Sequence, residues 1–290
     1  MSHQDEALSK SDFARLRTLI YAQSGINLNS DKKTMLELRI KRRLRSLNLV
    51  SFADYCDYLF SAQGQKDEIV NLLDVVSTNK TDFFREPEHF EYLVQKVIPE
   101  LVARQESGTD SGRPLLLWSA GCSTGEEPYT LAMVVNEWGQ THSGLRFRVL
   151  ATDLSTTVLE KAGRGIFSAE VVRPVPSDLR HKYFMRSRNR DSNLLRVVPE
   201  LRQLIEFRRL NFMNADFGLS QKADVIFCRN VIIYFDRATQ EQIMQKLAAQ
   251  LVPGGYAFVG HSETLHDMDL PLVPVAPALY RKTGQHRTCD

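Results

Sequence analysis

Residues 115–129, which read LLLWSAGCSTGEEPY, constrain the fold of this chain more than any other segment. The segment begins with an apolar run, continues through Ser119, Ala120 and Gly121, and ends in two acids and a helical pattern. This order predicts a buried parallel strand, a tight turn, and a helix that begins at the turn. In doubly wound α/β domains, nucleotide-like cofactors bind at such a turn after the first strand.

The acids Glu126 and Glu127 narrow the class of cofactor. A helix N-terminus attracts anions, and two carboxylates placed there would repel a pyrophosphate. S-adenosylmethionine instead carries an ammonium group and a sulfonium, which acids favour. The pattern Gly121-x-Ser123-x-Gly125 also differs from the G-x-G-x-x-G of dinucleotide sites. Glu127 is the candidate partner of the ammonium and Glu126 its competitor, although complementarity to the helix dipole explains both acids about equally well.

The composition is that of an ordinary globular protein, with 43% hydrophobic and 25% charged residues among 290. A net charge of +2 is too small to indicate a nucleic-acid-binding protein. No apolar run approaches the roughly 18 residues of a membrane span, and the N-terminus has no signal-peptide core. The four cysteines and seven histidines are scattered. The sequence therefore predicts a cytoplasmic protein with reduced thiols and no metal site.

Residues 1–78 predict an N-terminal α-helical domain. A first helix begins near Ser11 and Asp12, and shorter helices are expected near 52–61 and 66–76. Residues 79–114 form a linker with a connecting helix near 87–104, followed by a polar loop.

A second helix is expected over 31–47, with Met35, Leu38 and Leu44 as its apolar stripe. Its other face is basic and holds Lys32, Lys33, Arg39, Lys41, Arg42, Arg43 and Arg45.

Residues 115–290 alternate between strand and helix patterns, which indicates a mostly parallel sheet covered by helices on both faces. The expected strands are 115–119, 147–152, 205–210, 223–228, 256–260 and 278–281, and the expected helices are 127–138, 155–163 and 237–251. Residues 173–204 interrupt the alternation with two β-prone runs around the turn SRNRDSN, which predicts an inserted hairpin.

Polar side chains follow several of these strands. Asp153 ends the second strand, where an acid can accept hydrogen bonds from a ribose diol; the alternative is a helix N-cap. Asn211 and Phe212 follow another strand and suit an adenine. Val231 and Ile232 stand where amino methyltransferases carry two prolines, which disfavours a nucleic-acid N-methyltransferase.

Four motifs together resemble the CheR family of chemotaxis-receptor glutamate methyltransferases: TNKTDFFR at 78–85, SAGCSTGEEPY at 119–129, CRNVIIYFD at 228–236 and GHSE at 260–263. The resemblance spans nearly the whole chain. It implies an α-helical domain joined to an α/β, Rossmann-like class I methyltransferase domain with a small inserted antiparallel β-subdomain. The reaction implied is methyl transfer from S-adenosylmethionine to receptor glutamates in chemotactic adaptation, which leaves S-adenosylhomocysteine.

The resemblance also implies roles for individual residues. Arg85 and Tyr234 would lie nearest the transferred methyl group as catalytic residues. The cofactor site would comprise Asn79, Thr81, Arg85, Glu127, Asp153, Asn211, Phe212, Arg229 and Asn230.

The basic helix has two interpretations of similar weight. It is either a solvated face or a surface that meets the acidic methylation region of a chemoreceptor, and nucleic acid would satisfy the same charges. The turn SRNRDSN contains no glycine, which argues against docking of a receptor C-terminal peptide on the hairpin. The alternatives to receptor methylation are a methyltransferase acting on RNA or a small molecule, and a cofactor-binding regulator without turnover.

Overall fold

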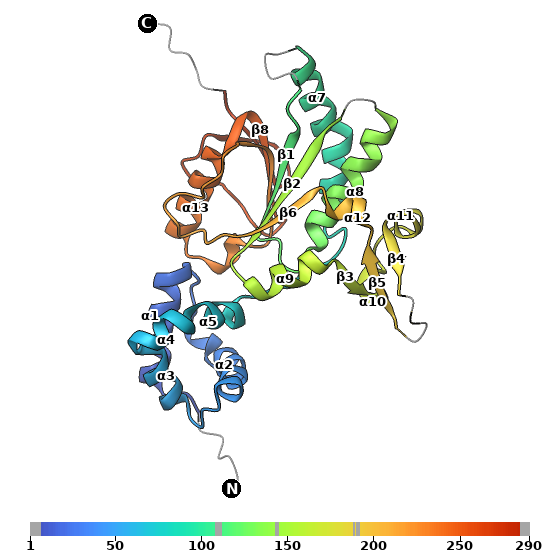
Figure 1. The fold of residues 1–290 in the computed structure, drawn as a ribbon. Coiled ribbons are helices and arrows are strands. Elements are labelled where there is room, and N and C mark those ends of the chain that lie inside the picture. The colour runs from blue at the N-terminus through green and yellow to red at the C-terminus, as the bar shows by residue number, and fades with distance from the viewer. Residues whose placement is uncertain (1–6, 108–111, 143–144, 188, 190–191, 285–290) are drawn as a thin grey trace, which may run out of the picture.

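The computed structural model describes residues 7–107, 112–142, 145–187, 189 and 192–284. Figure 1 shows a bundle of short helices at the N-terminal end of the chain, beside a larger domain built around a twisted sheet. No helix within these ranges is long and apolar enough to cross a membrane.

The N-terminal bundle is held together by one buried apolar cluster. Ser9, rather than the predicted Ser11, caps the first helix, because its side chain accepts from the backbone N–H of Asp12. Ser51 and Asp54 form a reciprocal capping box at the third. The helices are α1 Lys10–Ser24, α2 Lys33–Leu47, α3 Phe52–Phe60, α4 Ala62–Asp67 and α5 Ile69–Val76.

Helix α2 buries a face that shares Leu44 with the predicted stripe and otherwise differs from it, because Leu38 is exposed and Met35 is only partly buried. Leu36, Ile40 and Leu44 are buried, whereas Leu38 is 62% exposed. Apolar side chains occupy two neighbouring faces of this helix, and packing against α5 and α3 selects the face whose members are four residues apart.

The larger domain contains a seven-stranded sheet with the order β6-β2-β1-β7-β8-β10-β9. Its first five strands are parallel, and β10 runs antiparallel to both of its neighbours. The bounds are β1 Leu115–Ala120, β2 Phe147–Asp153, β6 Ile205–Arg209, β7 Ala223–Cys228, β8 Leu251–Val259, β9 Leu272–Ala276 and β10 Leu279–Lys282. The sequence predicts all of these strands except β9, an edge strand that contains Pro274.

Helices cover both faces of this sheet, as the alternating pattern predicts (Figure 1). One face of the sheet is covered by α6 Pro87–Tyr92, α7 Ile98–Ser107, α8 Glu126–Thr141 and α9 Thr156–Arg164. The other face is covered by α13 Arg237–Ala249. A π-helical turn over Leu93–Val97 joins α6 to α7. Strands β2 and β6 lie between β1 and one edge of the sheet. The chain then returns past β1, and β7 and β8 lie in the direction of the other edge. The carboxyl ends of β1 and β7 therefore flank the switch point at which such sheets bind ligands.

A separate antiparallel sheet with the order β3-β5-β4 forms the inserted subdomain. Its strands are β3 Ile166–Ser168, β4 Phe184–Arg186 and β5 Leu194–Val197, and short helices α10 Ala169–Val172, α11 Ser177–Tyr183 and α12 Pro199–Arg202 accompany them. The sequence predicts the β4–β5 pair but misses β3, which spans only three residues and precedes the expected insertion. The turn SRNRDSN lies partly outside the described residues, and the expectation about peptide docking stays a prediction.

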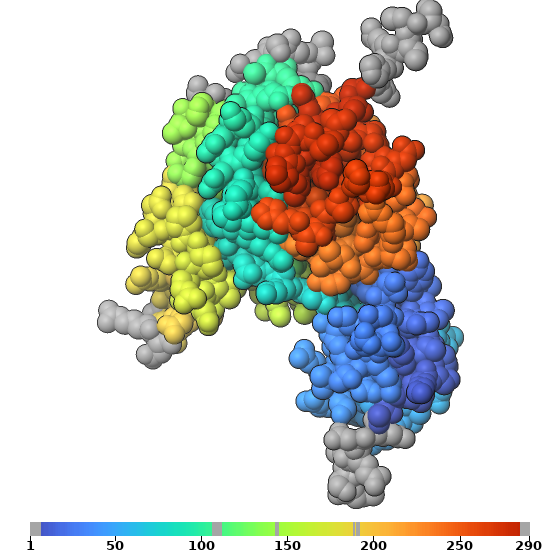
Figure 2. Space-filling model, turned by 180° about the vertical axis from the view of Figure 1, so that it is seen from behind, coloured from blue at the N-terminus to red at the C-terminus, as the bar shows by residue number. Residues whose placement is uncertain are grey.

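The helical bundle docks beside the carboxyl ends of the large sheet. The hydroxyl of Tyr21 donates to Asp236 at 2.6 Å, and the backbone N–H of Asn27 donates to the carbonyl of Tyr234 at 2.9 Å. Figure 2 shows the bundle packed against the lower edge of the larger domain from the reverse side. The bundle is therefore placed where it can contribute to a site at these strand ends.

Asp74 of α5 acts as a helix cap across the domain boundary. Its carboxylate accepts from the backbone N–H of Thr156 at 2.9 Å and from its hydroxyl at 2.7 Å. It also accepts from the hydroxyl of Thr157 at 2.9 Å. A carboxylate at the first turn of α9 satisfies unpaired N–H groups and complements the helix dipole. This contact joins the bundle to the second domain.

We expect Asp74→Ala to loosen the bundle from the larger domain. Loss of a side-chain cap costs about 1–2 kcal/mol. The linker should become easier to cleave, which limited trypsin digestion at the exposed Lys80 measures. Asp67→Ala, which removes an exposed acid from α4, is the matched control. Equal cleavage rates for both variants and the unaltered protein would contradict the role of Asp74 in docking.

Candidate functional site

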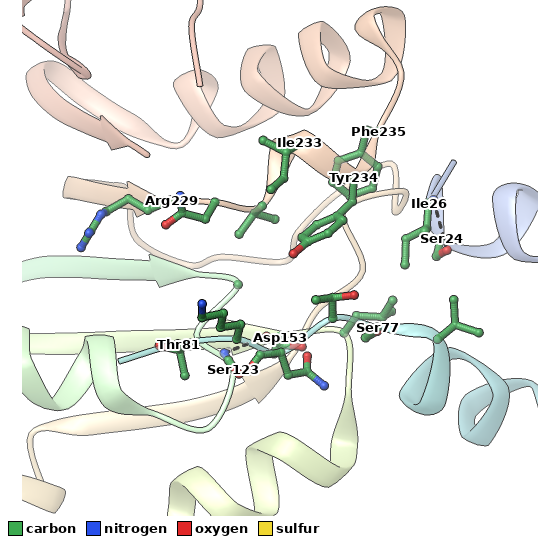
Figure 3. Close-up of a pocket in the computed structure, with 18 of the residues that line it drawn as sticks. Ser24, Ile26, Ser77, Thr81, Ser123, Asp153, Arg229, Ile233, Tyr234 and Phe235 are labelled. Atoms are coloured by element: carbon green, nitrogen blue, oxygen red, sulfur yellow. Dashed lines mark hydrogen bonds between the residues drawn. The ribbon is translucent and has the colours of Figure 1, made fainter. Parts of the chain in front are cut away.

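A cavity of about 500 Å³ lies at the carboxyl ends of β1, β2 and β7 (Figure 3). The linker and the bundle complete its wall with residues 76–82 and 26–29. A volume of this size is typical of sites for small-molecule cofactors. All of the residues that sequence analysis assigns to the site line this cavity: Asn79, Thr81, Arg85, Glu127, Asp153, Asn211, Phe212, Arg229, Asn230 and Tyr234.

The turn after β1 needs glycine for steric reasons. Gly121 has φ +90°, and a Cβ added there would lie 2.5 Å from a methyl group of Val231. The N–H groups of Gly121 and Cys122 both donate to the carbonyl of Thr152. The turn therefore approaches the segment after β7 closely and narrows the cavity between them.

Only one of the two acids at the start of α8 faces the cavity. Glu127 lines it, accepting from the hydroxyl of Ser119 at 2.7 Å. Glu126 is buried elsewhere and accepts from the hydroxyl of Thr124 at 2.7 Å. Burial raises the pKa of Glu127, and the nearby Arg229 acts in the opposite direction. Of the pair, Glu127 is therefore the acid that can meet a cationic group in the cavity.

Asp153 stands at the end of β2 with its carboxylate fixed by two backbone groups. It accepts from the N–H of Ser123 at 2.8 Å and from that of Ser155 at 2.9 Å. The N-cap of α9 is Ser155, whose hydroxyl accepts from Val158, so the alternative interpretation of Asp153 as this cap is wrong. Each carboxylate oxygen keeps further acceptor capacity for a ligand hydroxyl.

The amide of Asn211 is engaged within the protein. Its Nδ2 donates to the carbonyl of Gln23 at 2.6 Å, and its Oδ1 accepts from the N–H of Met213 at 3.0 Å. Asn211 thus ties the turn after β6 to the helical bundle. The adenine contact expected of Asn211 and Phe212 stays a prediction.

The linker enters the cavity in a strained conformation. Phe84 and Glu86 both have φ +55°, which is rare for residues other than glycine, and they flank Arg85. Arg85 Nη1 donates to the carbonyl of Lys80 at 3.1 Å. The buried ring of Phe83 anchors the segment, so Arg85 is held at the cavity wall.

Arg229 is buried between two carboxylates. Its Nη2 lies 3.1 Å from an oxygen of Glu86 and its Nη1 lies 3.3 Å from one of Glu127. Nη2 also donates to the carbonyl of Arg85, and the guanidinium carbon lies 5.3 Å from the ring centroid of Phe90. Burial opposes ionisation of Glu86, yet Arg229 outweighs it and lowers the pKa of that carboxyl. The sequence patterns assign no role to Glu86, whose one clue is its place beside Arg85.

Glu263 positions the segment after β7, a role that the sequence does not predict. Its buried carboxylate accepts from the backbone N–H groups of Asn230 at 2.7 Å, Val231 at 2.8 Å, Ile232 at 2.9 Å and Gly260 at 2.6 Å. Asn230 has φ +57°, so these bonds hold a strained residue in place. The sequence clue to Glu263 is its place at the end of the GHSE motif, three residues after the predicted strand 256–260.

Comparison with known proteins agrees with the sequence motifs. Residues 11–77 match the family described as "CheR methyltransferase, all-alpha domain", and residues 79–275 match "CheR methyltransferase, SAM binding domain". The chain is 36% identical to the chemotaxis protein methyltransferase of Borreliella burgdorferi, over 95% of each chain. It is 39% identical to chemotaxis protein methyltransferase 2 of Pseudomonas aeruginosa, over 90% of this chain and 89% of that one. The Escherichia coli chemotaxis protein methyltransferase is also 39% identical, over 91% and 87%.

These matches confirm the predicted resemblance, the fold class and the cofactor. The cavity at the switch point has the size and the acids that S-adenosylmethionine needs. With both domains matched in order and relatives aligned along nearly the whole chain, the protein belongs to the CheR family of S-adenosylmethionine-dependent chemotaxis methyltransferases.

Proposed function

We propose that this chain methylates glutamate side chains of bacterial chemoreceptors and thereby forms glutamyl methyl esters. The observation that supports this most directly is a cavity whose lining differs in charge from one part to another. Asp153 and Glu127 come from the strand-end wall, where the cation Arg229 is already paired with Glu86 and Glu127. Three cations, Lys32, Lys80 and Arg85, come from the bundle and the linker, which contribute a single acid to the lining, Asp82. Acids suit a cationic cofactor, and cations suit an anionic acceptor.

At the strand-end wall, Glu127 would pair with the ammonium group of S-adenosylmethionine and Asp153 would accept from the ribose hydroxyls. Phe212 would offer its ring to the adenine. The other lining residues assigned to the cofactor by sequence would complete this part of the site: Asn79, Thr81, Asn211, Arg229 and Asn230.

The acceptor would enter beside Arg85 and Tyr234. S-adenosylmethionine supplies a methyl group on a sulfonium. A glutamate with a pKa near 4.3 is ionised at neutral pH, so the chain need not provide a general base. Arg85 would orient the carboxylate, and the Tyr234 hydroxyl, which Figure 3 shows directed into the cavity, would donate to it. Catalysis would then rest on alignment and exclusion of water.

The basic surface available to a receptor is smaller than the sequence predicts. Arg43 forms a two-pronged ion pair with the buried Glu68, with nitrogen–oxygen distances of 2.7 and 2.8 Å. Arg39 donates to the carbonyls of Val76 and Ser77. Both arginines therefore hold α2 against α5 and its C-terminal end, and they are tied to the bundle rather than presented to solvent.

A narrower stripe on α2 remains for a receptor. Met35 lines the cavity, Leu38 is exposed, and Arg42 and Arg45 are exposed further along the helix. Spacings of three and four residues place these side chains on one face. We propose that a receptor helix lies along this stripe and presents a glutamate at the cavity.

The proposed reaction is tested with radiolabelled S-adenosylmethionine and membranes that contain chemoreceptors. We expect label on the receptor band that mild base releases as methanol, because esters hydrolyse there. Base-stable label, or transfer to RNA or small molecules instead, would favour the alternative class of methyltransferase and contradict receptor esterification.

Reversal of charge on the stripe should impair receptor methylation. We expect Arg42→Glu with Arg45→Glu to raise the KM for receptor membranes while the Kd for S-adenosylhomocysteine stays unchanged. The defect should shrink as salt rises, because surface attraction is screened within about 10 Å at 0.1 M.

Lys96→Glu with Lys222→Glu changes the net charge equally at exposed positions outside the cavity lining, and is the control. An equal KM for both double variants at low salt would show that the stripe does not meet the receptor.

Asp153→Ala should weaken cofactor binding. The loss of a charge-assisted hydrogen bond to a ribose hydroxyl is worth about 1.5–3 kcal/mol. Calorimetric titration with S-adenosylhomocysteine measures the change in Kd. Asp178→Ala, which removes an exposed acid, is the control. Unaltered affinity in a folded Asp153→Ala protein would remove Asp153 from the site.

A further inference from the structure

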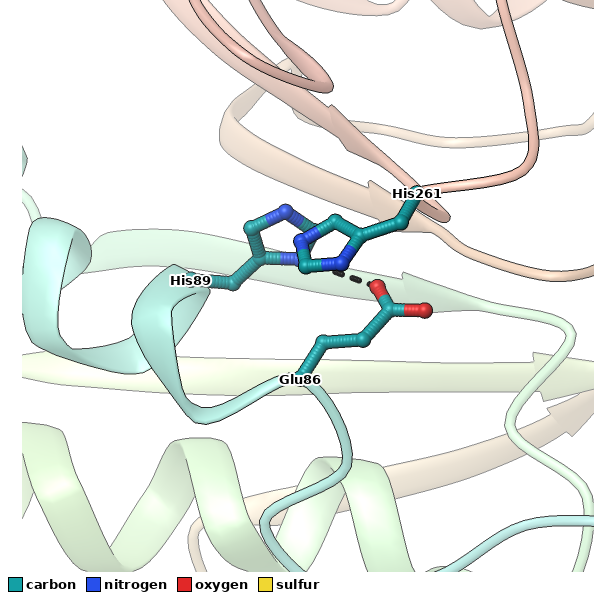
Figure 4. Close-up of side chains that lie close together, drawn as sticks. All are labelled: Glu86, His89 and His261. Carbon is teal, nitrogen blue, oxygen red and sulfur yellow. Dashed lines mark ion pairs between the residues drawn. The ribbon is translucent and has the colours of Figure 1, made fainter.

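Three side chains able to hold a metal ion converge beside Arg229. Glu86 ends the linker, His89 lies in α6 and His261 follows β8. Their ligand atoms all lie within 4.8 Å of one another. Figure 4 shows the three side chains meeting from separate elements. The histidines are dispersed along the sequence and predict no metal site, and the fold brings two of them together.

His89 carries the strongest indication that the cluster receives a ligand. The residue is only 4% exposed, yet neither of its ring nitrogens has a hydrogen-bond partner. The nearest oxygen of Glu86 lies 3.5 Å from Nδ1, too far for a good hydrogen bond. The ring of His261 stands perpendicular to it, with 4.8 Å between centroids. Buried polar atoms almost always have a partner, so the unpaired nitrogens call for one.

We propose that Glu86, His89 and His261 form a binding site for a divalent cation of the Zn²⁺ type beside the cofactor pocket. Two imidazole nitrogens and one carboxylate oxygen are the donor set of sites that keep a fourth position for water. The same donors disfavour Mg²⁺ and Ca²⁺, which prefer oxygen ligands.

The cluster needs only a small adjustment to close on an ion. Ligand atoms around a tetrahedral zinc lie about 3.4 Å apart, given bonds of about 2.0–2.1 Å. A separation of up to 4.8 Å therefore requires a movement of about 1 Å. His261 is exposed, so its ring can turn toward the buried His89 and also gives an ion a path from solvent.

The neighbouring guanidinium of Arg229 lowers the affinity that we expect of this site for a dication. Arg229 lies 3.1 Å from the same carboxylate of Glu86 that would ligate the ion. A dication close to this cation is repelled, so we expect micromolar rather than nanomolar affinity. An ion that draws Glu86 away leaves Arg229 to its other acid, Glu127. If Glu127 binds the cofactor ammonium as proposed above, then metal and cofactor bind with negative coupling.

The site is tested first without the cofactor. Chelator-treated, untagged protein is titrated calorimetrically with Zn²⁺, and Co²⁺ is added separately to record the visible absorption of a low-coordinate complex. We expect one saturable site at micromolar Zn²⁺. His261→Ala, which removes an exposed side chain and should fold normally, is expected to weaken binding at least tenfold, and Glu86→Gln should do likewise.

His181→Ala is the matched control, because His181 is an exposed histidine on α11, outside the cluster. It should leave the Zn²⁺ affinity unchanged. Absence of saturable binding, or equal affinity in the His261→Ala and His181→Ala proteins, would refute the site whatever reaction the chain catalyses.

The coupling is tested by titration of S-adenosylhomocysteine with and without saturating Zn²⁺. We expect Zn²⁺ to raise the Kd severalfold in the unaltered protein and to have a smaller effect at the same concentration in His261→Ala. A Kd that does not respond to Zn²⁺ in the unaltered protein would refute the coupling.

Discussion

The cofactor pocket depends on the buried guanidinium of Arg229. It joins the linker, through Glu86 and the carbonyl of Arg85, to the start of α8, through Glu127. A buried cation is tolerable only when it is paired, and removal of one partner leaves an uncompensated charge. The positions of the linker and of the first helix of the sheet domain are thus mutually dependent, although they come from distant parts of the chain.

Strained backbone surrounds this ion network. Seven described residues other than glycine have positive φ. Four of them, Phe84, Glu86, Ser123 and Asn230, lie in segments that form the cavity wall, and the other three, Asn48, Asp267 and Ala278, lie elsewhere. Such conformations persist only where other contacts over-determine them. Glu263 supplies this constraint after β7, and the hydroxyl of Ser123, which donates to the linker, supplies it after β1. Four of the strained residues of the fold are thus held in place beside the cofactor pocket.

The helical bundle is a part of the site rather than an appendage. Its loop contributes residues 26–29 to the cavity, and its contacts with Asn211 and Asp236 reach the ends of β6 and the start of α13. A methyltransferase domain alone would leave the cavity open on this side. The bundle therefore closes the cavity, which excludes water from the reaction centre, and it also carries the surface on α2 that is proposed to meet the receptor.

The sequence by itself determined the layered α/β fold, the glycine turn after β1 and ten of the residues that line the pocket. The fold and the turn follow from local periodicity and steric needs, and the pocket residues follow from ordered motifs shared with a known family. The sequence favoured Glu127 over Glu126, and tertiary structure decided between them, since the two acids are adjacent in sequence and differ in what surrounds them. It also decided that Arg43 is tied to Glu68, because long-range pairing cannot be read from charge along one helix. The meeting of His89 with His261 has the same origin: it requires the path of the folded chain.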